Sequence, residues 1–229
     1  MLLKKCWNSF VKIILENVAL HDVNAPFPGY ADGNLTLRAL RQDEINDFVV
    51  WLRDPELARY TFGLKPQAGE AYVQTVVDNY VANLERVLNN YAAICTDEKL
   101  IGSIFFNTRN VSGQRLAIVG IVIGLSQERR RGYGARSLQM MLKFLFEELS
   151  CDFVELDTAN YNIAAQRTYE KLGFQRCQSQ WIYEGLDVFP NANMAPPIYY
   201  RLSSQQWRES NGPTDYISRL DGCQLPSRQ

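Results

Sequence analysis

The segment of the chain best suited to chemistry is a short basic run that contains two glycines. Its residues are Arg129, Arg130, Arg131, Gly132, Tyr133, Gly134 and Ala135. Glycine has no Cβ, so the backbone at such a position can turn tightly and approach a ligand closely. If a helix begins here, its first N–H groups have no intrahelical acceptor and its dipole favours a negative charge. The run therefore predicts a site where main-chain N–H groups hold a phosphate or pyrophosphate.

The flanking sequence supplies the elements that such a site needs. The β-branched residues Ile121, Val122 and Ile123 predict a strand before the run, and apolar residues recur at helical spacing over 133–149. A dinucleotide loop would read G-x-G-x-x-G and a P-loop would end in Gly-Lys-Ser/Thr, and the run has neither pattern. It is thus typical of a site for the pyrophosphate of a different ligand, with an ordinary strand-to-helix turn as the alternative.

A second informative segment lies between 162 and 174. Asn162 is a residue type preferred at helix N-termini, and Gly173 is a type that ends helices, so the sequence predicts a short helix between them. Tyr169 follows Asn162 by seven residues, or two helical turns, which places both on one face. For Asn162, a plain helix cap explains the residue type as well as a ligand contact does.

Both segments resemble signatures of the GNAT superfamily of acyltransferases. The acyl-CoA loop of that family has the form Q/R-x-x-G-x-G/A between its fourth strand and third helix, and Arg129, Gly132 and Gly134 fill the defined positions. Segment 162–174 is similar to the second signature, an Asn followed by a short helix ending Tyr-Glu-Lys-Leu-Gly-Phe. The resemblance covers about residues 35–202. Segments 35–38 and 51–56 are similar to the branch that holds ribosomal-protein N-terminal, spermidine and some aminoglycoside and amino-sugar acetyltransferases.

The resemblance implies an N-acetyltransferase that moves an acetyl group from acetyl-CoA directly to a primary amine, without a metal. The acceptor would be a small-molecule amine or a protein N-terminus. Main-chain N–H groups of the loop would hold the coenzyme A pyrophosphate, and the preceding strand would pair with the pantetheine arm. The cofactor-binding residues implied in this way are Ile121, Val122, Ile123, Arg129, Arg131, Gly132, Tyr133, Gly134, Ala135, Asn162 and Tyr169.

An amine acceptor sets two requirements for proton transfer. An aliphatic amine has a pKa near 10, so only about one molecule in a thousand is a neutral nucleophile at pH 7. The leaving thiolate needs a proton, which we expect Tyr169 to donate, because the pKa of a phenol is also near 10. A purely structural buried aromatic residue is the alternative interpretation of Tyr169.

The expected base or amine anchor is Asp157. Many relatives carry a glutamate where the fourth strand begins, whereas this chain has Ile118 at that place. By the same resemblance, Asp157 at the end of the next strand matches an aspartate of the aminoglycoside-modifying relatives. Glu155 would share its face by strand alternation, and Glu184 and Asp187 in a later loop are further alternatives. Because of Ile118, a non-catalytic acyl-CoA-binding regulatory or structural module of the same fold remains a second hypothesis.

The fold expected from this resemblance is α/β (α+β), with a mixed, mostly antiparallel central sheet flanked by helices. We predict an extension and linker over 1–34, the acetyltransferase domain over 35–209 and a flexible tail over 210–229. Expected helices lie within 42–62, 68–88, 133–149 and 162–172. Expected strands cover 35–40, 91–96, 100–107, 116–123, 151–158, 175–183 and 197–202, with a tight turn at Asp97-Glu98 joining the second and third.

Composition excludes several classes of function. Hydrophobic residues make up 46% of the chain, which suits a globular core, and the formal charge of −1 gives no basic surface for nucleic acid. The five cysteines have no metal-ligand spacing, which favours a reduced, cytoplasmic protein without a metal site. Lys12 and Glu16 interrupt the apolar run near the N-terminus, so no membrane association is expected. A homodimer is left open.

Overall fold

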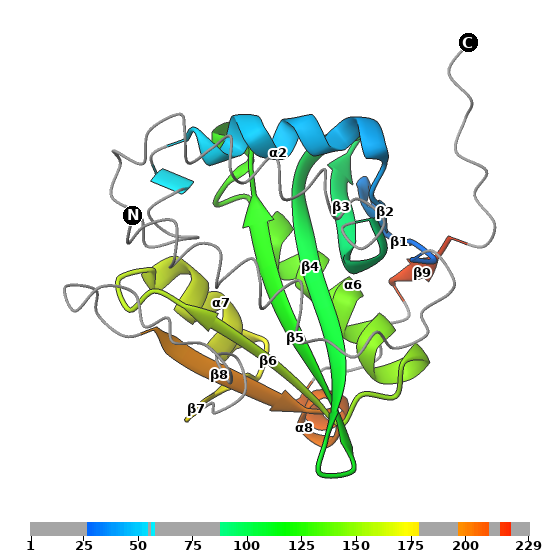
Figure 1. Ribbon diagram of the computed structural model, residues 1–229, viewed down its shortest axis with the longest axis vertical. Helices are drawn as coiled ribbons and strands as arrows, with labels where there is room; N and C mark the ends of the chain where they lie inside the picture. The colour runs from blue at the N-terminus through cyan, green and yellow to red at the C-terminus, as the bar shows by residue number, and fades with distance from the viewer. Residues whose placement is uncertain (1–26, 55, 58–87, 179–196, 211–215, 221–229) are drawn as a thin grey trace, which may run out of the picture.

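The computed structural model describes residues 27–54, 56–57, 88–178, 197–210 and 216–220 (Figure 1). Their centre is one sheet of nine strands in the order β7-β8-β6-β5-β4-β3-β2-β1-β9. Only β5 and β6 pair in parallel among these neighbours, so the mostly antiparallel α/β fold predicted from the sequence is confirmed. The strands are β1 (Tyr30–Asp32), β2 (Leu35–Ala39), β3 (Tyr91–Thr96), β4 (Lys99–Val111), β5 (Gln114–Ile123), β6 (Phe153–Thr158), β7 (Gln175–Cys177), β8 (Ile198–Ser203) and β9 (Ser218–Arg219).

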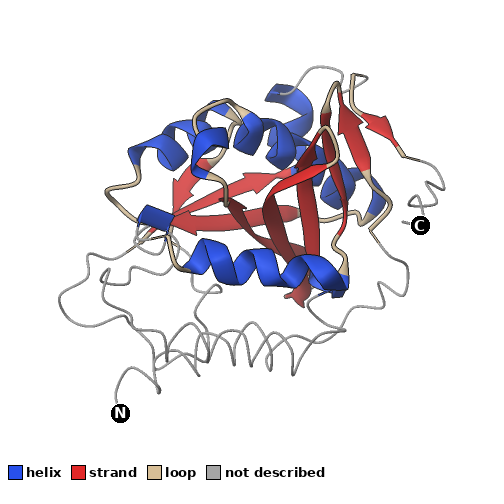
Figure 2. Cartoon of the chain, turned by 90° about the horizontal axis from the view of Figure 1, so that it is seen from above, coloured by secondary structure: helices blue, strands red, loops and turns tan. Residues whose placement is uncertain are grey.

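Helices lie on both faces of this sheet, as Figure 2 shows. The larger core packs the first face against the apolar side of α6, with Leu138, Met141 and Leu142 wholly buried. The smaller core places Trp51 of α2 on the opposite face, against Ala93. The helical elements are η1 (Gln42–Glu44), α2 (Ile45–Leu52), η2 (Ser126–Glu128), α6 (Tyr133–Lys143), the π-helical η3 (Phe144–Glu148), α7 (Ile163–Lys171) and α8 (Ser204–Ser210).

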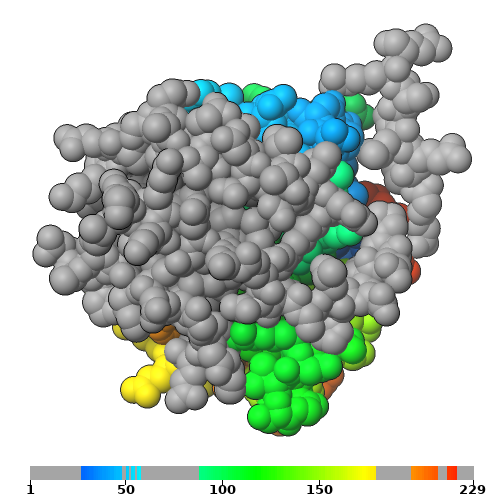
Figure 3. All heavy atoms as spheres, viewed as in Figure 1, coloured from blue at the N-terminus to red at the C-terminus, as the bar shows by residue number. Residues whose placement is uncertain are grey.

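Two tight turns build the central hairpins. Asp97 and Glu98 join β3 to β4 with φ values of 47° and 66°, which confirms the turn expected there. Ser112 and Gly113 join β4 to β5 with φ values of 51° and 83°. Successive positive φ values match the right-handed twist of the flanking strands. The second hairpin is longer than the sequence indicated, because the polar residues at 108–110, and Val111 after them, still pair in register with β5. Its tip reaches the surface in Figure 3, coloured green.

The folded region extends past both expected domain limits. Tyr30 of β1 is almost wholly buried, although it belongs to the predicted linker, and Ile217 is buried next to β9 in the predicted tail. β1 pairs with the edge strand β9 through Tyr30 and Arg219. Isolated strands of two or three residues carry no sequence signal that could have indicated this pairing. The division into extension, domain and tail is otherwise a prediction, because most of 1–34 and of 210–229 lies outside the described residues.

Other expected elements are largely present where they can be compared. Tyr133 begins α6 as predicted. The end of the predicted helix differs, because α6 continues into the π-helical η3, where the N–H of Leu149 donates to the carbonyl of Phe144 at 3.1 Å. The strand expected at 175–183 is described as β7 up to Cys177. Three predictions fall outside the described residues. They are nearly all of the helix expected at 68–88, the later part of the strand at 175–183, and the alternative bases Glu184 and Asp187.

Candidate active site

The central opening of the molecule lies between the two parallel strands. β5 pairs with β4 along its whole length, but it pairs with β6 only at Leu116, Ala117 and Ile118. The strands then separate, as Figure 1 shows from the bottom of the sheet upward. Residues 119–123 of β5 therefore have no described strand partner on the β6 side. Unpaired backbone N–H and C=O groups on such an edge can pair with an extended ligand.

The loop after β5 leads from this open edge to the N-terminus of α6. Gly132 caps that helix with φ of 84°, and Arg130, two residues before it, also has a positive φ, of 63°. A Cβ at Gly132 would have no atom within 4 Å, so backbone conformation and not crowding explains the glycine. The N–H of Arg136 bonds to the Gly132 carbonyl at 3.2 Å. The N–H groups of Tyr133, Gly134 and Ala135 precede it and form the anion-binding end of the helix.

Gly134 has a different role from Gly132. Its φ is helical, and a Cβ there would lie 3.9 Å from the side chains of Ile121 and Ile123. These two isoleucines are partly buried against the larger core, which agrees with their interpretation as packing residues. The first turn of α6 thus rests on the same stretch of β5 that presents the open edge. Val122 points to the opposite face and packs against the smaller core.

The basic side chains of the loop are paired with acids of the same chain. Arg131 is largely exposed, forms an ion pair with Glu128 at 2.8 Å, and has its guanidinium carbon 6.0 Å from the ring centre of Tyr133. Arg129 turns inward and forms ion pairs with Asp54 and with a neighbouring glutamate. These pairs offset much of the positive charge. Binding of an anion by the loop would therefore rely chiefly on main-chain N–H groups and the helix dipole.

Asn162 is the N-cap of α7. Its Oδ1 accepts a hydrogen bond from the N–H of Ala165 at 3.2 Å. The side chain of Gln166 strengthens the same turn by donating to the carbonyl of Asn160 at 2.7 Å. The capping role of Asn162 thus has direct geometric support, and its contact with a cofactor stays a prediction.

Tyr169 lies on the buried side of α7. Its ring centre is 5.6 Å from that of Tyr200 and 6.1 Å from that of Phe174, and the residue is only 6% exposed. Burial raises the pKa of the Tyr169 hydroxyl well above its ordinary value, and the nearby Asp157 carboxylate raises it further. The ordinary phenol pKa near 10, on which the expected proton donation was argued, therefore does not apply to this buried group, and the donation itself stays a prediction. The raised pKa keeps the hydroxyl protonated, so it is able to donate a hydrogen bond.

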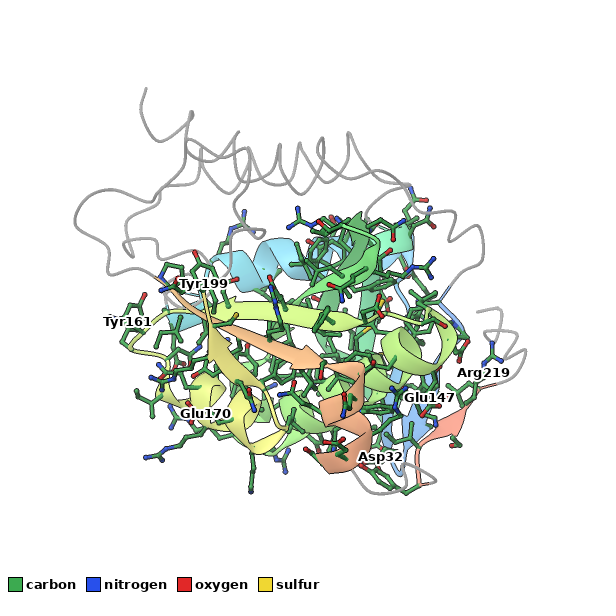
Figure 4. The ribbon with its side chains drawn as sticks, turned by 90° about the horizontal axis from the view of Figure 1, so that it is seen from below. Asp32, Glu147, Tyr161, Glu170, Tyr199 and Arg219 are labelled. Atoms are coloured by element: carbon green, nitrogen blue, oxygen red, sulfur yellow. The ribbon has the colours of Figure 1, made fainter. Side chains whose placement is uncertain are left out.

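Asp157 lies in register with Tyr199, which the sequence analysis did not single out. Figure 4 shows Tyr199 near the start of β8, at the end of the sheet where β6 leads into the loop carrying Tyr161. Burial raises the pKa of Tyr199 to about 12, and Asp157 contributes to the shift. Asp157 thus influences two phenols, Tyr199 on the adjacent strand and Tyr169 on α7. The three residues are 12 to 42 positions apart in the sequence, so no local pattern could have grouped all of them.

Glu155, the alternative base, forms an ion pair with Arg201. Its side chain is wholly buried and accepts a hydrogen bond from Nε of Arg201 at 2.6 Å. Ile118 is its register partner on β5. The position that holds an acid in many relatives is therefore the apolar Ile118 here. The buried acid next to it is Glu155 on the neighbouring strand, and it is paired with Arg201. This arrangement leaves Asp157 as the better candidate for contact with an acceptor.

The described residues also bear on metals and membranes. No group of three or more His, Cys, Asp or Glu side chains that could hold a metal ion occurs among them. Within the same ranges, no helix combines the length and apolar character needed to cross a membrane.

A mostly antiparallel sheet that opens between two parallel strands, with a helix N-terminus at the opening, defines the class of acyl-CoA-binding acetyltransferase domains. Residues 34–175, more than half of the chain, match the family model described as the acetyltransferase (GNAT) domain. The chain belongs to this family. No curated protein matches the sequence.

Solved structures of low sequence identity share the fold. One is the spermidine N-acetyltransferase from Vibrio cholerae in complex with CoA and spermine, with TM-score 0.57, 20% identity, and coverage of 76% of this chain and 98% of that chain. Another is Mycobacterium smegmatis RimJ in complex with CoA-disulfide, with TM-score 0.59, 13% identity, and coverage of 80% and 90%. A GNAT-family acetyltransferase from Bacillus anthracis has TM-score 0.58, 17% identity, and coverage of 77% and 99%.

Proposed function

We propose that this protein is an N-acetyltransferase that moves the acetyl group of acetyl-CoA directly to a primary amine. The observation that carries the proposal is the continuity of one surface. The open edge of β5 over 119–123 leads into the Gly132 turn and the N-terminus of α6. An extended pantetheine arm along the edge would bring its pyrophosphate to the main-chain N–H groups of residues 131–135.

The residues present fit coenzyme A in two respects. A Cβ at Gly132 would enter open space, so that side of the turn is open for a ligand to approach. Ile121 and Ile123 point into the core, which leaves the backbone groups of Ile121 and the N–H of Ile123 for pairing on the strand edge. The Ile123 carbonyl already accepts a hydrogen bond from Nε of Arg129. The GNAT-family V. cholerae structure named above is a complex with CoA, which supports the same ligand class for this chain.

For the transfer step we assign complementary roles to Asp157 and Tyr169. The amine nitrogen attacks the thioester carbonyl carbon, the C–S bond breaks, and the nitrogen loses a proton while the sulfur gains one. Asp157 would hold the ammonium form of the acceptor and accept its proton directly or through water. Tyr169 would donate to the leaving sulfur. A thiolate that forms in the same buried surroundings is also made more basic, which restores the driving force for this donation.

The acceptor class follows from the carboxylate. A half-buried Asp157 beside two phenols offers one negative charge and hydrogen-bonding groups, a set suited to an ammonium group. The V. cholerae enzyme is a spermidine N-acetyltransferase, crystallised with spermine, which makes a polyamine a natural first test. A protein N-terminus, an amino sugar and an aminoglycoside present the same ammonium chemistry, and all four belong in the screen.

A non-catalytic acyl-CoA-binding module is the second candidate. Ile118 favours it, because the strand position that holds an acid in many relatives is apolar here and its neighbour Glu155 is tied to Arg201. Such a module would bind acetyl-CoA without turnover.

Steady thiol release from acetyl-CoA separates the two functions. The protein is incubated with acetyl-CoA and one of the four amine classes, and calorimetric titration with CoA is run on the same sample. An enzyme gives amine-dependent release and an acetylated amine by mass spectrometry. Tight binding of CoA with no release for any class would support the module instead. A lack of binding would contradict both.

A further inference from the structure

Arg129 fills the first position of the cofactor loop, yet its guanidinium points back into the protein. Its Nε donates to the carbonyl of Ile123 at 3.0 Å, and Nη2 donates to that of Gly124 at 2.8 Å. Nη2 also donates to the Asp54 carboxylate at 2.5 Å, and Nη1 donates to Glu56 at 2.9 Å. Four hydrogen bonds use four of the five N–H donors of a guanidinium. Little of the group remains for a phosphate.

The charge of Arg129 is also neutralised within the chain, by two carboxylates. Its side chain is 16% exposed and contacts two carboxylates, so the cluster as a whole is not positive. Burial alone would raise the pKa of Asp54, but the bond from Arg129 and the N–H groups of Leu57 and Glu56 lower it overall. Asp54 is therefore ionised at neutral pH and holds the guanidinium. An anion approaching this cluster would meet no net attraction.

A second contact joins the same two segments. A Cβ added to Gly124 would lie 2.0 Å from the indole of Trp51, so only glycine lets the end of β5 pass this close to the last turn of α2. Trp51 is 6% exposed at this contact. The ion pairs of Arg129 and the packing of Trp51 thus fix the start of the cofactor loop against α2 and the residues that follow it.

The segment held in this way belongs to the face of the sheet that carries Asp157. Val122 packs with Trp51 in the smaller core, and Ile118 shares its face of β5 by alternation. Ile118 is in register with Glu155, whose face of β6 also includes Asp157. Arg129 therefore connects the loop that would hold the cofactor to Asp54 and Glu56, which follow the helix whose Trp51 packs on that face.

We propose that Arg129 is a positioning residue that clamps the cofactor loop to the segment after α2, and that it is not a ligand of the pyrophosphate. The proposal rests on the proposed function to the extent that the loop must bind CoA. It gives the first residue of the loop motif a mechanical role: the loop has its binding conformation only while Asp54 and Glu56 are docked on it. Order on the acceptor face and affinity for the cofactor are thereby coupled.

The test exploits Asp54, an anion that cannot itself attract a pyrophosphate. If Arg129 bound the phosphate, Asp54→Asn would free its guanidinium and leave the Kd for CoA unchanged or lower. A clamp predicts the opposite. Asp54→Asn and Arg129→Gln should each raise that Kd about tenfold, the effect of losing a charge-assisted hydrogen bond that orders the site. The double variant should be no weaker than Arg129→Gln alone, because both changes break one unit.

Two further variants complete the design. Arg129→Lys keeps the charge but cannot span four acceptors, so it should bind CoA as weakly as Arg129→Gln. Arg208→Gln changes an exposed arginine of α8 and should bind CoA as the wild type does. Glu56→Gln replaces Asp54→Asn if the latter does not fold. Any one of three results would overturn the clamp. They are a wild-type Kd for CoA in Arg129→Gln, a wild-type Kd in Arg129→Lys, and a Kd below that of the wild type in Asp54→Asn.

Hydrogen exchange of the CoA-free proteins gives a readout that does not depend on turnover. Amides of residues 124–135 should exchange several-fold faster in Asp54→Asn than in the wild type, because the loop loses its support. Unchanged exchange would contradict the clamp. If no amine is acetylated but binding and exchange respond as described, only the catalytic part of the proposed function fails and the clamp stands.

Discussion

The loop before α6 and the cluster around Asp157 are encoded over very different spans of sequence. The loop is continuous: strand, turn and helix N-terminus follow one another within residues 119–136, and its ligand groups are main-chain N–H groups. The cluster joins β6, α7 and β8, which come together only in the folded sheet. Anion binding by backbone therefore has a local signature, whereas proton transfer by side chains depends on partners that the sequence does not reveal.

The largest effect is expected at the turn itself. Gly132→Val should abolish measurable binding of CoA, because a β-branched residue is strained at φ of 84° and its side chain would stand where the ligand approaches. Gly113→Val is a closely matched control: φ is 83°, and a Cβ there would also meet no atom within 4 Å, but it lies on the β4–β5 turn. Calorimetry should show binding only in the control. Equal binding in both folded variants would remove the loop from the cofactor site.

Tyr169→Phe tests the cluster. Removal of the hydroxyl should lower turnover about 10²-fold, as is typical when a general acid is lost. The Kd for CoA should change little, because the ring keeps its packing against Phe174 and Tyr200. A structural role predicts the reverse pattern, with a loss of about 1 kcal/mol in stability and normal turnover. Turnover and melting temperature measured on the same preparation decide between them.

Asp157→Asn distinguishes an anchor from a base. As an anchor, Asp157 holds the ammonium group, and its loss should raise KM for the amine about tenfold with a smaller change in kcat. As a base, its loss should lower kcat and change the pH profile of turnover. Steady-state rates over a pH series, with amine and acetyl-CoA varied separately, provide the comparison. Full turnover across the series would move both roles to another residue.

The smallest effect on activity is expected at Glu155. Glu155→Gln leaves Arg201 without its buried carboxylate and should destabilise the fold by about 2 kcal/mol, below the usual cost for a fully buried pair because Arg201 is partly exposed. Turnover of the folded fraction should be nearly normal. Urea unfolding and initial rates check the two parts. A loss of turnover larger than that of Asp157→Asn would make Glu155 the better candidate for the base.

Residue types and spacing alone determined the elements that carry the strongest local patterns. The glycine loop, the start of α6 at Tyr133 and the Asp97-Glu98 turn follow from backbone preferences that act within a few residues. The resemblance of two short motifs was enough to indicate the family. The strand from Ile121 to Ile123 was likewise visible, because a β-branched run favours extended backbone.

Only the tertiary structure decided which groups meet across the sheet. It placed Tyr199 beside Asp157 and gave Glu155 to Arg201. It also turned Arg129, which the loop pattern assigned to the cofactor, onto Asp54 at a separation of 75 residues. The physical reason is that a side chain's charge, pKa and free donors depend on burial and on long-range neighbours, whereas a turn or a helix N-terminus depends on the backbone of the residues that form it.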